Sequence, residues 1–91
     1  MGNRAVVSIV GKDRIGIIAR VAAILAENEV NILDISQTIM QEFFTMIMLV
    51  DFGGDRGRFS RVQDELIAAG QELGLKITMQ QEDVFNFMHR I

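Results

Sequence analysis

The sequence predicts an α+β sandwich in which two helices cover one face of a four-stranded antiparallel sheet. Its 91 residues are enough for one domain. Four segments carry the apolar pattern of strands, and two segments between them carry the apolar spacing of helices. Their order along the chain is strand, helix, strand, strand, helix, strand, and a further short helix follows at the end.

The first strand and the first helix are joined by a polar loop. Residues 4–10 are apolar on both faces, which is typical of a central strand. Residues 16–28 have helical spacing. The side chains expected on the inner face of this helix are Ile17, Ile18, Val21, Ile24, Leu25 and Asn28. The loop between them reads Gly11-Lys12-Asp13-Arg14-Ile15-Gly16.

The next two segments form a predicted β-hairpin. Residues 30–40 are rich in branched side chains, and their alternation changes parity, so we expect a bulge or bend near residues 32–34. The connection Gln41-Glu42 is short enough for a hairpin. Residues 43–50 are apolar on both faces and therefore predict a second central strand.

The second helix follows the glycine-rich loop at residues 53–57. Ser60 is a candidate cap, and Arg58 or Gly57 is an equally good boundary. Gly70 either weakens the last turn or allows close packing, and Gly74 suits the helix end. Residues 75–80 alternate as an edge strand does, and residues 82–91 predict a short amphipathic helix.

With right-handed crossovers, this order of elements gives the split βαβ, or ferredoxin-like, sandwich. We expect one domain over residues 1–91, with its core at 4–81. The open face of the sheet should carry Val6 or Val7, together with either the Met46/Met48 pair or the Ile47/Leu49 pair. Hydrophobic residues make up 49% of the chain, so a partner subunit is expected to cover part of this surface.

Composition excludes several classes of function. The net charge of −3 and the scattered arginines disfavour nucleic acid as a partner. The chain has no cysteine, and no apolar stretch approaches the ~20 residues of a membrane span. The methionines suit a soft core or an interface better than a copper site, and no cofactor is expected. A cytoplasmic location is the default expectation.

The polar loop is the first candidate for a binding site. A helix N-terminus offers unpaired N–H groups and the positive end of the helix dipole to a small anion. Gly11 and Gly16 leave room for a ligand beside the backbone, whereas a tight turn without a ligand is the alternative. Asn31 is the second candidate, because it begins a largely apolar strand and its amide both donates and accepts. The alternative for Asn31 is a turn residue that closes the helix.

The loop and the helix start together resemble the opening of an ACT domain, and Asn31-Ile32 resembles the second hallmark of that family. The resemblance covers residues 4–81. The segments Asp34-Ile35-Ser36-Gln37-Thr38 and Glu42-Phe43-Phe44-Thr45-Met46 are similar to those of small stand-alone ACT proteins of bacteria and archaea, a family once uncharacterised. The loop is also similar to those of the glycine-cleavage repressor.

The resemblance implies a small ligand, often an amino acid, at a boundary between subunits, where the loop of one copy meets the second strand of its neighbour. Asp13 would receive an ammonium or a metal, or else cap the helix, and Arg14 would pair with a carboxylate or remain solvated. Gly16, Ile17 and Ile18 would donate backbone N–H groups. The ligand-binding residues expected are Gly11, Asp13, Arg14, Gly16, Ile17, Ile18, Asn31 and Ile32.

The function expected is a non-catalytic, homodimeric regulatory module that binds an amino acid and passes a signal to an unknown partner protein. One alternative is an assembly subunit that binds no small molecule. A more remote alternative is an acylphosphatase-like hydrolase, in which Arg14 would cradle phosphate and Asn31 would position water. No metal ligand set, nucleic acid or membrane contact is expected.

Overall fold

The computed structural model describes residues 3–12, 16–54 and 56–82 of the chain. It contains four strands and two helices in the predicted order. The strands are β1 (Arg4–Lys12), β2 (Asn31–Met40), β3 (Phe43–Asp51) and β4 (Lys76–Gln81), and the helices are α1 (Ile17–Glu27) and α2 (Arg56–Leu73). The helix expected over residues 82–91 lies outside the described residues, apart from Glu82.

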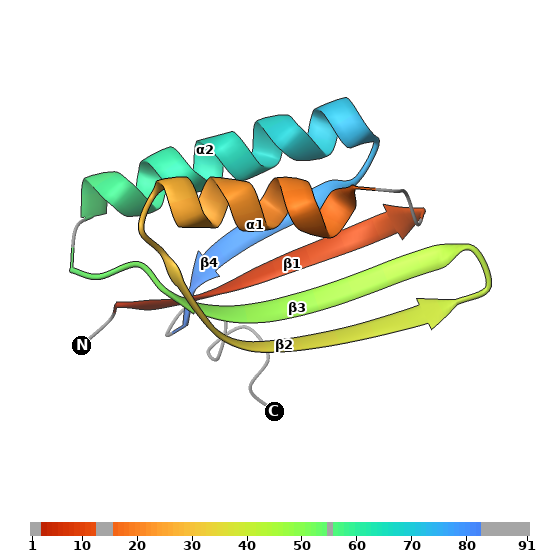
Figure 1. Ribbon diagram of the computed structural model, residues 1–91, viewed down its shortest axis with the longest axis horizontal. Helices are drawn as coiled ribbons and strands as arrows, with labels where there is room; N and C mark the ends of the chain where they lie inside the picture. The colour runs from red at the N-terminus through yellow and green to blue at the C-terminus, as the bar shows by residue number, and fades with distance from the viewer. Residues whose placement is uncertain (1–2, 13–15, 55, 83–91) are drawn as a thin grey trace.

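The strands form one antiparallel sheet in the order β2-β3-β1-β4, with both helices on the same face (Figure 1). This arrangement is the ferredoxin-like sandwich that the order of elements predicted. β1 and β3 are the central strands, as their two-sided apolar pattern indicated. The register between β2 and β3 shifts between Ile32 and Asp34, which confirms the predicted bulge.

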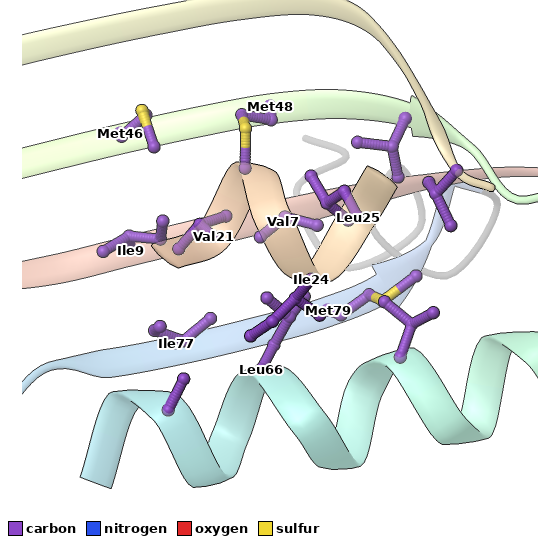
Figure 2. Packing of buried hydrophobic residues seen from close by; sticks show 14 of the residues in the cluster. Val7, Ile9, Val21, Ile24, Leu25, Met46, Met48, Leu66, Ile77 and Met79 are labelled. Carbon is purple, nitrogen blue, oxygen red and sulfur yellow. The ribbon is translucent and has the colours of Figure 1, made fainter. Parts of the chain in front are cut away.

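The core lies between the sheet and the helices (Figure 2). β1 contributes Val7 and Ile9, and β3 contributes Met46 and Met48. The Met46/Met48 pair therefore faces the helices, and Val6, Ile47 and Leu49 lie on the open face of the sheet. The sequence left these two assignments open, because both sets in β3 are apolar.

The boundary of the second helix differs from the expectation. α2 begins at Arg56, ahead of all three proposed boundaries, so Ser60 is inside the helix and does not cap it. At the other end, Gly74 has the expected left-handed backbone, with φ of 74°. The N–H of Leu75 donates to the carbonyl of Gly70 at 2.7 Å, which closes the helix.

The two helices are joined by a buried amide. Asn28 is 7% exposed, and its side chain donates to the carbonyl of Ile24 at 2.8 Å and to Glu65 Oε1 at 3.1 Å. Its Oδ1 atom accepts a hydrogen bond from Arg61 Nε at 2.9 Å. Asn28 thereby links the end of α1 to two residues of α2.

Candidate functional site

Gly16 marks the start of α1 and leaves open space beside the backbone. Its φ and ψ are 91° and 0°, a left-handed conformation that glycine adopts without strain. A Cβ atom built at Gly16 would meet no heavy atom within 4 Å across the described part of the chain, its chain neighbours aside. The glycine is thus required by the backbone, and the position above it can receive a small group.

The N-terminus of α1 is open to such a group. No side chain of the described residues caps it, and its first turn holds no acidic residue. The side chain of Ile17 is buried and anchors this turn to the core, whereas that of Ile18 is 49% exposed. The free N–H groups and the helix dipole therefore favour an anion here.

Gly11 has a different reason for lacking a side chain. It lies inside β1, paired with Phe44, and a Cβ atom there would come 2.5 Å from Leu75 Cδ2. The packing of Leu75, at the start of the β4 segment, accounts for this glycine. Packing alone explains why this position is a glycine, without the expected role of making room for a ligand.

Two ion pairs lie at the same end of the molecule. Lys12 Nζ is 3.4 Å from Glu42 Oε2, and Arg20 Nη2 is 3.1 Å from Glu72 Oε1. All four side chains are about half exposed or more. Exposed pairs of this kind contribute about 0–1 kcal/mol, so a charged ligand can compete with them. The sequence did not indicate Glu42 or Glu72 as residues near the site. The one signal was Lys12, the ion-pair partner of Glu42, which belongs to the loop motif.

β2 begins with Asn31 and Ile32, and this start lies at the opposite end of the sheet from the end of β1, which leads into the loop (Figure 1). Asn31 pairs with Asp51 on β3, whereas Gly11 pairs with Phe44, seven residues earlier on the same strand. Seven residues of antiparallel strand span about 24 Å. A single chain therefore does not bring the two halves of the predicted site together. Asp13 and Arg14 lie outside the described residues.

β2 is an edge strand whose ten residues are all exposed. Among the described residues, no strand pairs with the outer edge of β2, and the helices leave this strand uncovered. Ile35 and Ile39 face the helix side of the sheet, opposite Met48 and Phe44, yet they are 47% and 56% exposed. A long, apolar, uncovered edge is a template for pairing with another strand.

The described residues contain no group of three or more histidine, cysteine, aspartate or glutamate side chains that could hold a metal ion. None of their helices combines the length and the apolar character that a membrane crossing needs.

Comparison with known proteins agrees with this architecture. The family model of the ACT domain matches residues 3–80, and the chain belongs to the ACT domain family. A UPF0237 protein of Methanocaldococcus jannaschii is 53% identical over 89 residues, which cover 98% of this chain and 99% of that protein.

Two solved structures are similar as well. An ACT domain protein from Streptococcus pneumoniae is 40% identical, with a TM-score of 0.76 over 90% of this chain and 92% of that chain. A protein assigned as a glycine cleavage system transcriptional repressor is 29% identical, with a TM-score of 0.77 over 86% of this chain and 44% of that chain.

Proposed function

We propose that this chain is a non-catalytic regulatory module that binds an amino acid at the interface of a homodimer and passes the signal to a partner protein. The ACT domain family is one of regulatory modules that bind small ligands. The observation that carries the proposal is the separation of Gly16 and Asn31 in one chain, together with the uncovered edge at β2.

A second copy resolves the separation. Two copies related by a two-fold axis can pair their β2 strands antiparallel, which continues the sheet from one copy into the other. In that arrangement, the start of the partner's β2 lies beside the end of this β2. That end also holds the β2–β3 hairpin and the N-terminus of α1 (Figure 1). Asn31 of one copy is thereby carried to the end of the molecule that holds Gly16 of the other.

The chemistry at this end suits a zwitterion. The N–H groups of α1 take the carboxylate, and the amide of Asn31 from the second copy bonds either group. Asp13 supplies a carboxylate for the ammonium, and Arg14 is available for a carboxylate on the ligand. The Lys12–Glu42 pair offers one charge of each sign beside the site. Gly11, Ile17 and Ile32 complete the site through their backbone.

Binding produces a signal because the ligand touches both copies. It binds the closed dimer better than any looser arrangement and shifts the population toward it. A partner protein that distinguishes the two arrangements then receives the signal. The hydrolase alternative needs Arg14 and Asn31 in one site, and Gly11, in the same loop as Arg14, lies about 24 Å from Asn31 along the sheet of one chain.

A thermal-shift screen against the twenty amino acids tests the proposal. A ligand at 100 times its dissociation constant adds about 2.7 kcal/mol to the free energy of unfolding, which raises Tm by several degrees. The shift should disappear in Asn31→Ala and persist in Asn3→Ala, a control at the same end of the sheet. If no amino acid raises Tm, the assembly-subunit alternative replaces the proposal.

A further inference from the structure

The outer strand β2 directs the backbone groups of every second residue away from the sheet (Figure 1). Met40 pairs with Phe43 across a two-residue turn, and a β-turn of this length bonds the N–H of its last residue to the carbonyl of its first. The backbone groups of Met40 therefore face β3. Because the direction of these groups alternates along a strand, those of Ile39, Gln37 and Ile35 face outward.

The N–H of Ile35 gives independent evidence of this direction. It donates to Oδ1 of the adjacent residue Asp34 at 2.9 Å, so a side-chain oxygen lies where a neighbouring strand would supply a carbonyl. Asp34 is exposed, and its bond to Ile35 is a local one that competes with strand pairing. A carbonyl from a second strand can therefore replace the carboxylate.

The residues with outward backbone groups also share one face of the sheet. Ile35 and Ile39 flank Gln37 on the helix side, opposite buried residues of β3. The two isoleucines are nevertheless 47% and 56% exposed, because the sheet ends at β2. A strand added at this edge would bury them.

Two-fold symmetry limits how a second copy of β2 can pair with the first. In an antiparallel pair, residues directly opposite each other share a face of the sheet, so the two-fold axis brings one residue opposite its own copy. With Gln37 on the axis, Ile35 lies opposite Ile39 of the second copy, and Ile39 lies opposite Ile35. All the outward backbone groups of these three residues then have partners, and each isoleucine meets an isoleucine.

The neighbouring registers fit less well. With Ser36 on the axis, each Ile35 would lie opposite Gln37, which sets an apolar side chain against an amide. With Ile35 on the axis, Gln37 would lie opposite Leu33, where the bulge interrupts the strand. With Thr38 on the axis, Ile35 would lie beyond the end of the opposite strand. The register centred on Gln37 avoids all three mismatches.

We propose that two copies of the chain pair along residues 35–39 of β2, with Gln37 of each copy on the two-fold axis. The isoleucine pairs lie on the helix side of the joined sheet. On the open face, Ser36 of one copy lies opposite Thr38 of the other, and their hydroxyl groups bond across the strands.

This register also sets the position of Asn31. The strand of one copy extends past Met40 of the other, so Asn31 lies toward the end of the molecule that holds Gly16 of the second copy. The inference rests on the proposed function, because it specifies how the site shared between the copies is assembled.

Disulfide cross-linking tests the register directly, because the chain has no cysteine. Residues directly opposite each other have Cα atoms about 4.5–5.5 Å apart, which a disulfide can bridge. Gln37→Cys should therefore form a covalent dimer by itself, at least about tenfold faster than Ser60→Cys, an exposed control on α2. Non-reducing electrophoresis of the oxidised proteins measures the rates.

A second pair of variants provides a matched control on β2 itself. In the proposed register, the Cα atoms of Ser36 and of Thr38 each lie about 7–8 Å from those of their own copies, at the limit of a disulfide. Ser36→Cys and Thr38→Cys should each link slowly alone, and they should link to each other rapidly when refolded together.

Two results would overturn the inference. Faster self-linking of Ser36→Cys than of Gln37→Cys would place a different residue on the axis, and rates no higher than that of Ser60→Cys would show that β2 does not pair with its copy. The thermal shift of the wild-type protein with an amino acid is measured separately. A shift together with a different register would leave the proposed function intact, whereas linking at Gln37 without any shift would support this inference and remove the proposed function.

Discussion

Gly16 and Gly74 both have a left-handed backbone, but only Gly16 adjoins the candidate site. Substitutions at the two positions therefore distinguish an effect on stability from an effect on ligand binding. Their φ angles are 91° and 74°, and a Cβ atom at either position meets no described atom within 4 Å. Both substitutions to alanine therefore introduce strain without a steric clash.

We predict that Gly16→Ala and Gly74→Ala each lower the free energy of unfolding by about 1–2 kcal/mol, the cost of a left-handed alanine. Urea denaturation measures this loss. Only Gly16→Ala should also reduce the thermal shift with an amino acid, because only Gly16 adjoins the candidate site. Equal loss of the ligand response in both variants would contradict that assignment.

Asn28 is a second residue whose hydrogen-bond partners determine how much a substitution destabilises the protein. We predict that Asn28→Ala lowers the free energy of unfolding by about 1–3 kcal/mol, because it removes three hydrogen bonds at a buried position. Arg20→Ala breaks an exposed ion pair between the same two helices and should cost about 1 kcal/mol or less. Urea denaturation of both variants checks the order, and a larger loss in Arg20→Ala would contradict it.

At the scale of elements, the two edge strands differ in length and in protection. β2 has ten residues, all exposed, whereas β4 has six, and its Met79 carbonyl is bonded by Gln63. An edge strand whose backbone is occupied in this way pairs less readily with another chain. The structure thus favours β2 as the edge for self-association.

We predict that Ile39→Glu converts the homodimer to a monomer, because it places two carboxylates in an apolar interface formed by β2 and its copy. Sedimentation equilibrium measures the mass. Ile67→Glu is the matched control, since Ile67 is also an exposed isoleucine but lies on α2. A dimer that persists in Ile39→Glu would show that the copies associate through another surface.

For the whole molecule, the proposed site consists of parts from two chains, and this makes a quantitative prediction. Gly16→Ala and Asn31→Ala should each bind the amino acid poorly as homodimers. Refolded together in equal amounts, half of the dimers are mixed, and each mixed dimer has one intact site and one site with both changes. Binding capacity should then return to about a quarter of the wild-type value. Isothermal titration calorimetry of the mixture measures it, and no recovery would place both residues in the site of one chain.

The sequence predicts those features of the fold that depend on residues close together in the chain. The bulge near residues 32–34, the left-handed Gly74 and the two central strands follow from short patterns, and all of them are confirmed. The predicted start of α2 at Ser60, Arg58 or Gly57 was wrong, since the helix begins at Arg56. The partners of Asn28 and the contact of Gly11 with Leu75 join residues far apart in the chain, so no local pattern indicates them.

The sequence by itself determined the order of the elements, the fold class and the family, since each depends on spacing and on motifs that the chain carries in short segments. Only the tertiary structure showed which apolar face of β3 meets the helices. It also showed that the end of β1, which leads into the loop, and Asn31 lie at opposite ends of the sheet. The physical reason is that α1 leads the chain from the end of β1 back along the sheet to the start of β2 (Figure 1). Residues that are neighbours in the motif pattern are thereby separated in space, and only a second chain can bring them together.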